Sequence, residues 1–172
     1  MELWDILDEN GNKTGRLYKR GCGIPLGKGE YHLVVHVWIV NSKGQFLVSK
    51  RTPNKSYPNM WECTGGAAVS GDDSLKTALK EVREELGISL KPENGEMLWE
   101  FKLEDDVSNN IYNAWLFKQE VDINDVVFQE GETCDAILAD KHMILQMIDT
   151  GQFIGKDYFP YLDELFERCE KL

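Results

Sequence analysis

The chain has 172 residues, of which 42% are apolar, and its formal net charge is −11. This length and composition suffice for one packed core, so we expect residues 1–172 to form a single domain. The negative charge argues against a nucleic-acid polymer or an anionic membrane as a partner, because clustered Lys and Arg bind both of these.

The first thirty residues are predicted to form a small β extension, residues 1–30. Residues 2–7 are typical of a short strand, and turn residues follow at 8–12. Residues 14–19 can pair back on that strand. Residues 21–30 are rich in glycine and are expected to form a surface loop.

The segment of residues 31–41 is typical of a central strand buried on both faces, because it is rich in β-branched and aromatic side chains. Residues 45–50 return after a tight turn, which predicts a hairpin. Residues 51–60 contain two prolines and are expected to form an ordered loop. Residues 61–69 begin as an extended segment.

A helix is predicted from Asp73 to Leu86. Asp72, Asp73 and Ser74 can cap its N-terminus, and Gly87 is a natural C-terminal stop. The apolar residues that repeat at helical spacing are Leu75, Ala78, Leu79, Val82 and Leu86.

The second half of the chain continues with strands and helices in alternation. Strands are predicted at 97–103 and 111–121, a helix at 139–150, and a further helix within the last fifteen or so residues, near Pro160. Interleaved strands and helices favour an α/β fold in the form of a layered sandwich.

The four cysteines are widely scattered and form no CxxC pair, which is typical of reduced thiols in a cytosolic protein. No signal peptide is visible, and the longest apolar stretch is too short to span a bilayer. We therefore expect a cytoplasmic protein with no membrane partner.

Three carboxylates share one side of the predicted helix. Glu81 and Glu85 are one turn apart, and Glu84 is three residues from Glu81. A charged run of this kind is commonly a solvated surface. Here, however, Gly65 and Gly66 lie upstream at a strand end, where the backbone can approach a ligand closely. Because a hard divalent cation binds clustered carboxylates, the combination favours a metal–phosphate site.

At this point the sequence resembles a known family. The segment from Gly66 to Ile88 is similar to the Nudix box, whose pattern is Gly, five residues, Glu, seven residues, then Arg-Glu-apolar-any-Glu-Glu-any-Gly-apolar. Asp72 stands where Glu is usual, and Lys80 replaces an Arg that could form a bidentate ion pair. The matching positions are Gly66, Glu81, Val82, Glu84, Glu85, Gly87 and Ile88. The order of strands around the box also resembles the Nudix domain.

The resemblance implies the Nudix fold, an α/β/α sandwich with a mixed central sheet. It also implies hydrolysis of a diphosphate bond in a nucleoside diphosphate, or another organic diphosphate, linked to a variable group. By position, Glu81, Glu84, Glu85 and the backbone carbonyl of Gly65 would hold Mg²⁺ or Mn²⁺. Such an ion screens the diphosphate and lowers the pKa of the attacking water.

The general base is predicted among the glutamates. Glu84 or Glu81 could serve, but many family members use a glutamate on a later loop, which here points to Glu130 or Glu132. An exposed acidic loop without a catalytic role is an equally good interpretation of that segment.

Residues before the box are candidates for substrate binding. Lys50, Arg51 and Lys55 could bind phosphate oxygens, and Trp61 or Tyr57 could stack on a base. Solvated charge and core packing are the alternative interpretations. The expected partner is a small-molecule diphosphate, and a homodimer is left open.

A second resemblance is to the Nudix subgroup close to isopentenyl diphosphate isomerase. That enzyme has a catalytic Cys before the box glycine and a metal-binding His after it, but Gly65 and Ala67 occupy these positions here. His32 matches an isomerase metal ligand, and Cys63 could share a face with Gly65, yet a core histidine and a structural thiol are simpler interpretations. Hydrolysis is therefore favoured. An isomerase-like enzyme and a non-catalytic module that binds a phosphorylated ligand are the alternatives.

Overall fold

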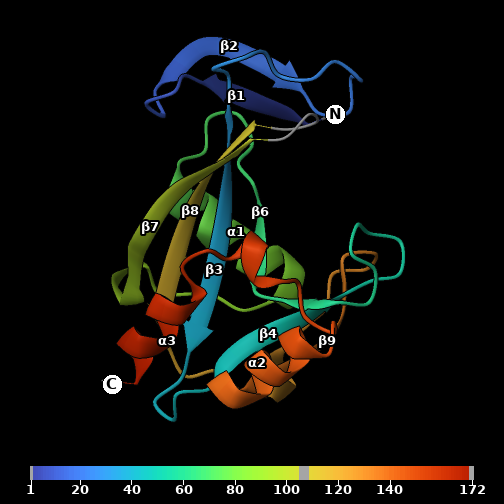
Figure 1. Ribbon diagram of the computed structural model, residues 1–172, viewed down its shortest axis with the longest axis vertical. Helices are drawn as coiled ribbons and strands as arrows, with labels where there is room; N and C mark the ends of the chain where they lie inside the picture. The colour runs from blue at the N-terminus through green and yellow to red at the C-terminus, as the bar shows by residue number, and fades with distance from the viewer. Residues whose placement is uncertain (1, 105–108, 171–172) are drawn as a thin grey trace.

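The computed structural model describes residues 2–104 and 109–170. A mixed β-sheet lies between helices on its two faces, as Figure 1 shows. The helices are α1 (Ser74–Leu86), α2 (Lys141–Asp149) and α3 (Leu162–Cys169). The strands are β1 (Leu3–Leu7), β2 (Lys13–Lys19), β3 (His32–Val40), β4 (Phe46–Arg51), β5 (Trp61–Glu62), β6 (Thr64–Ala67), β7 (Gly95–Glu104), β8 (Asn109–Lys118) and β9 (Thr133–Ala139).

The central strand β3 organises the sheet. It pairs in parallel with β8 along its length, and β8 pairs in turn with β7. On its other side β3 pairs antiparallel first with β6 and then, through Val40 and Phe46, with β4. The strands β5 and β9 both pair with β4. The sheet is therefore mixed, and the predicted hairpin of β3 and β4 is confirmed.

Both faces of β3 are buried because its side chains alternate between two cores. Val35, Val37 and Ile39 pack in the core that holds α1. Trp38 and Val40 pack in the core that holds α2 and α3. The predicted α/β/α sandwich is thus confirmed, with α1 behind the sheet and α2 and α3 in front of it in Figure 1.

The helix α1 forms where capping and spacing predict it. Asp73 is its N-cap, and the Asp73 side chain accepts a hydrogen bond from the Lys76 backbone N–H. Gly87 ends the helix in the left-handed region, with φ 70°. The buried face includes Ala78, Val82 and Leu86. Among the described residues, no helix is long and apolar enough to cross a membrane.

The prediction for residues 139–150 is partly wrong. Ala139 is the last residue of β9, Asp140 caps α2, and the helix begins at Lys141. The strand β9 was not predicted, because its partly exposed sequence lacks a clear alternation and it is stabilised by pairing with β4, which is distant in the sequence. The predicted strand at 111–121 ends earlier, at Lys118. The C-terminal helix is confirmed as α3.

The predicted N-terminal extension contains the β1–β2 hairpin, a two-stranded sheet of its own at the top of Figure 1. Backbone hydrogen bonds between Leu7 and Tyr31 join it to the start of β3. Leu7 and Tyr31 also pack with Ile111 of β8 in a small apolar cluster. The hairpin is therefore anchored at the end of the main sheet.

Candidate active site

A cavity of about 240 Å³ lies beside β6 and α1. Five parts of the chain form its walls: the helix α1, the glycines of β6, the loop between β4 and β5, the loop before β9 and the ends of the N-terminal hairpin. All three glutamates predicted to bind metal line it, and so does Gly65. The lining residues are Glu2, Arg20, Lys55, Gly65, Gly66, Ala67, Val69, Lys80, Glu81, Glu84, Glu85, Gln129 and Glu132.

The three glutamates of α1 differ in their surroundings. Glu85 is only 6% exposed, and desolvation, followed by the charge of Glu62, raises the pKa of Glu85 to about 8. Desolvation, followed by the charge of Glu84, raises the pKa of Glu81 to about 7. Glu84 itself is exposed. Lys80 and Lys55 lower the pKa of Glu81, and Lys55 lowers that of Glu85, but desolvation and the neighbouring carboxylates outweigh these charges, so both carboxylates are held in an unfavourable, partly dry environment.

The two glycines of β6 allow groups to approach its backbone closely. A Cβ atom on Gly66 would lie 2.3 Å from Glu81 Oε2, so the Glu81 carboxylate rests against the strand where a side chain would be. A Cβ atom on Gly65 would lie 2.3 Å from the Val35 carbonyl oxygen of the neighbouring strand. A larger residue at Gly66 would therefore displace the Glu81 carboxylate, whereas at Gly65 it would meet backbone that is held by strand pairing.

The donors in this cavity fit a hard divalent cation. They are carboxylate oxygens together with the backbone of β6. The absence of a side chain at Gly66 lets the Glu81 carboxylate lie against that strand. Within residues 2–104 and 109–170, no three acidic, His or Cys side chains already converge closely enough to hold a metal. The three glutamates line one cavity, and their side chains would have to move closer together to share an ion.

The raised pKa values predict that metal binding depends on pH. Glu81 and Glu85 must lose their protons to bind Mg²⁺, so we expect its affinity to rise about tenfold or more from pH 6 to pH 8. At pH 7, binding should release about one proton. Isothermal titration in buffers of different ionisation enthalpy measures this release, and Glu85→Gln should reduce it. Binding that is independent of pH and releases no proton would contradict the prediction.

The two departures from the box pattern lie together. Asp72 is buried, and its carboxylate lies 2.6 Å from Lys76 Nζ but 4.0 Å from Lys80 Nζ. Lys80 thus forms the looser pair expected of an ammonium group in place of a guanidinium. Lys80 also lines the cavity, where it stands near the glutamates.

Of the two candidate bases on the later loop, only Glu132 is among the residues that line the cavity. Its carboxylate pairs with Lys55 Nζ, and the pair closes the side of the cavity opposite α1. Glu130 is exposed and does not line this cavity.

A second pocket, of about 420 Å³, adjoins the first and shares Arg20, Lys55, Gly65 and Gly66 with it. Arg51 lines this pocket and donates a hydrogen bond of 2.6 Å to Glu62. The two pockets are therefore neighbours, and together they make up the cleft.

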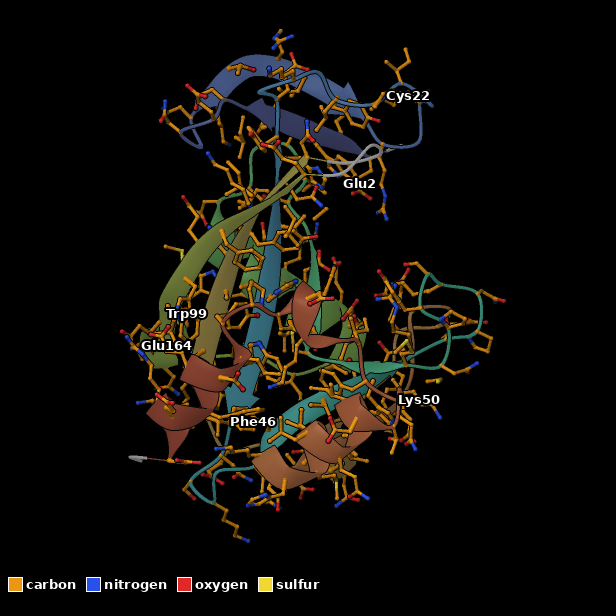
Figure 2. The ribbon with its side chains drawn as sticks, in the orientation of Figure 1. Glu2, Cys22, Phe46, Lys50, Trp99 and Glu164 are labelled. Carbon is orange, nitrogen blue, oxygen red and sulfur yellow. The ribbon has the colours of Figure 1, made fainter. Side chains whose placement is uncertain are left out.

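The other predicted substrate-binding residues lie elsewhere. Trp61 is buried in the core with α2 and α3, and Lys50 Nζ lies 5.7 Å from the centroid of the Trp61 ring. Neither is among the residues that line the two pockets of the cleft. Figure 2 labels Lys50 near the end of β4. Tyr57 is exposed.

The residues considered for isomerase chemistry are buried. His32 stacks on Trp4 with ring centroids 3.9 Å apart, and burial lowers the pKa of His32 to about 4. Burial raises the pKa of the Cys63 thiol well above its usual value. A thiol that stays protonated is a poor base or nucleophile. Gly65 and Ala67 line the cavity without an ionisable side chain.

Two residues that the sequence did not single out come from the N-terminal hairpin. Arg20 lines both pockets, and Glu2, labelled in Figure 2, lines the first. Arg20 Nη1 lies 3.0 Å from Glu2 Oε2, so the two residues line the first pocket as an ion pair. No local motif marks these residues, because only the folding of the hairpin onto the sheet brings them there.

Comparison with known proteins agrees with this geometry. The NUDIX domain family model matches residues 30–152. A Nudix hydrolase of Listeria monocytogenes is 36% identical over 168 residues, which cover 96% of this chain and 94% of that protein. The structure of DR0079 from Deinococcus radiodurans has a TM-score of 0.72 at 22% identity and covers 98% of this chain and 99% of its own.

A further similar fold is that of a bifunctional NMN adenylyltransferase/ADP ribose pyrophosphatase from Francisella tularensis, complexed with AMP and a Mn ion. Its TM-score is 0.61 at 15% identity, over 81% of this chain and 42% of that chain. The two solved structures agree in fold, whereas the family model and the full-length relative identify the family. The chain therefore belongs to the Nudix family, and it is a hydrolase that acts on diphosphate bonds.

Proposed function

We propose that this hydrolase depends on Mg²⁺ or Mn²⁺ and cleaves the diphosphate bond of a nucleoside diphosphate linked to a further group. One observation carries the proposal: the three glutamates of α1 line the same small cavity as Gly65 and Gly66 of β6. These glutamates are Glu81, Glu84 and Glu85. Carboxylates at this spacing beside an accessible backbone match what a diphosphate-binding metal requires.

In this proposal Glu81, Glu84, Glu85 and the Gly65 carbonyl would hold the ion. When bound, the ion would screen the diphosphate and lower the pKa of the attacking water. The Mn ion and AMP bound to the Francisella tularensis pyrophosphatase support this choice of metal and substrate class.

The cationic side chains of the cleft would bind the substrate. Arg20 and Lys55 belong to both pockets, so they stand where a diphosphate would pass from one to the other. When Lys55 binds a phosphate oxygen, Glu132 loses its partner and is free to accept the proton of the attacking water. A new P–O bond then forms as the bridging P–O bond breaks, and one phosphate leaves.

Glu132→Gln should lower kcat by about 10²–10³-fold, because the amide cannot accept that proton. The Mg²⁺ affinity should stay within about threefold, since other glutamates hold the ion. Glu130→Gln is the matched control on the same loop and should keep wild-type kcat. Equal activities of the two variants would show that Glu132 is not the general base.

The proposed function is tested by a hydrolysis screen with Mg²⁺ over nucleoside triphosphates, ADP-ribose, dinucleotide cofactors, CoA and isoprenoid diphosphates. Release of a phosphorylated product supports it. Conversion of isopentenyl diphosphate to its double-bond isomer would favour the isomerase alternative. If no compound is turned over while one of them raises the melting temperature, the chain is a binding module instead.

We further propose that residues 1–172 act as one domain in the cytoplasm. The hairpin contributes to the same cavity as the box helix, which supports a single functional unit. All four cysteines are free thiols, which is consistent with a reducing compartment.

A further inference from the structure

We infer that the 420 Å³ pocket binds a nucleobase of the substrate, and that the Nε2–H group of His36 is the buried donor that recognises an acceptor atom of that base. This inference rests on the proposed function, since it names the group that the diphosphate carries. It begins from an unsatisfied polar atom: among the described residues, His36 Nε2 is buried and has no hydrogen-bond partner. Such atoms are rare in native interiors and require an explanation.

The hydrogen bonds around His36 assign its tautomer. Trp38 Nε1–H donates to Tyr161 Oη at 3.0 Å, and an indole nitrogen can only donate. Among the hydrogen bonds of the described residues, His36 Nδ1, 2.9 Å away, is the acceptor for the Tyr161 hydroxyl proton, so we assign the proton to that contact. With Nδ1 accepting, a neutral imidazole carries its hydrogen on Nε2. The residue thus presents a donor that the surrounding protein does not use.

Five aromatic rings surround His36, and two of them face a pocket that also carries the charged side chains of Arg20, Arg51, Lys55 and Glu62. The Tyr158 and Phe159 rings lie 5.0 Å and 4.9 Å from the His36 ring, and all three residues line the pocket. Aromatic walls favour a ring that can stack, and a neutral buried donor favours a carbonyl or ring nitrogen over a charged group. A short alkyl chain would leave the Nε2–H group unsatisfied.

The position of the pocket fits the remainder of the substrate. Gly65 and Gly66 separate it from the box glutamates, and β3 pairs His36 with Gly65. A diphosphate near the glutamates would therefore extend its nucleoside towards His36. The volume lies within the range of pockets that enclose small organic ligands. Tyr158, at the end of the 3-10 helix Lys156–Tyr158, lines the pocket beside the His36 ring.

The kinetic test compares ADP with isopentenyl diphosphate, which carry the same terminal diphosphate on a nucleoside and on an alkyl chain. His36→Asn can still accept from Tyr161 but cannot reach the base, whereas His36→Gln places an amide donor near the Nε2 position. We expect His36→Asn to raise KM for ADP about tenfold with kcat nearly unchanged, and His36→Gln to recover much of the loss. KM for isopentenyl diphosphate should not change. His142→Asn, on the exposed face of α2, is the control.

A spectroscopic test measures the wild-type protein and needs a variant only to assign the signal. With ¹⁵N-labelled histidine, His36 should show the Nε2–H tautomer, and His36→Gln or His36→Asn assigns its signal among the three histidines. Addition of AMP should shift that Nε2 resonance, whereas inorganic phosphate should not.

The outcomes separate this inference from the proposed function. If ADP is hydrolysed but AMP leaves the His36 resonance unchanged, the N–H group is satisfied by a buried water and the inference is wrong. The same conclusion follows if His36→Asn changes KM for both substrates equally. If AMP shifts the resonance but no diphosphate is hydrolysed, the pocket assignment stands and the proposed hydrolysis fails.

Discussion

Glu85→Gln is expected to lower hydrolysis by more than about 100-fold and to make the metal-free protein more stable at pH 8. Activity falls because an amide is a much weaker ligand for a hard cation than a carboxylate. Stability rises because the substitution removes a charge that the cavity tolerates poorly in the absence of metal. Opposite effects on activity and stability are the signature of a functional residue.

The pH dependence of this effect follows from the pKa of Glu85, which the fold raises from 4.5 to about 8. Between these values the folded protein holds more protons than the unfolded chain, so this group destabilises the fold increasingly as pH rises from 4.5 to 8. The penalty is absent at pH 4 and complete above pH 8. We expect Glu85→Gln to stabilise the metal-free protein by roughly 4 kcal/mol at pH 8 and hardly at all at pH 4.5.

Denaturation at both pH values, with a chelator or with saturating Mg²⁺, measures this difference. Mg²⁺ should reverse the order at pH 8, because it stabilises only a protein that binds it. Glu93→Gln, at an exposed site, is the control and should change neither property. A destabilised Glu85→Gln protein that keeps its activity would show that Glu85 is a structural residue.

The adjacent glycines of β6 should respond oppositely to the same substitution. In Gly66→Ala the new Cβ meets the end of a flexible side chain, since Glu81 Oε2 would be 2.3 Å away. We expect Glu81 to be displaced, with Mg²⁺ affinity and kcat lowered by about 100-fold and Tm within about 3 °C of wild type. In Gly65→Ala the Cβ meets the Val35 carbonyl oxygen, which the β3–β6 pairing holds in place. That variant should lose about 3 kcal/mol of stability or more.

Thermal denaturation, Mg²⁺ titration and steady-state kinetics on both variants test this contrast. Gly155→Ala is the control, because the added Cβ would have open space around it. Gly71→Ala is not suitable, because Gly71 has φ 91°, where any side chain is strained. Full activity in Gly66→Ala would mean that Glu81 does not need to lie against β6 to bind the metal. Equal loss of stability in both variants would mean that both glycines are needed only for strand pairing in the sheet.

The features that the sequence predicted correctly are local. The α1 helix depends on a cap, an apolar repeat and a terminal glycine within one short segment, so its bounds and its three glutamates follow from spacing alone. The central strand is equally clear, because both of its faces are buried and its composition is correspondingly apolar.

The features that could not be predicted depend on contacts between distant segments. Lys50 and Arg51 are neighbours in the sequence, but the pairing of β4 with β9 shifts register between them, so their side chains take different directions. Arg51 therefore reaches the cleft while Lys50 lies over Trp61. The register that decides between them is set by the pairing of β4 with β5 and β9. Arg20 reaches the cleft only through the packing of the hairpin.

The position of the hairpin and of the C-terminal segment has a consequence for how this enzyme could diversify. The matched family region, residues 30–152, contains the box but excludes Arg20 at one end and Tyr158 and Phe159 at the other. All three line the pocket beside the glutamates. The matched region thus supplies the box and part of the pocket wall, while the rest of that wall comes from the two ends of the chain, so substitutions at Arg20, Tyr158 or Phe159 would alter the pocket without changing the box.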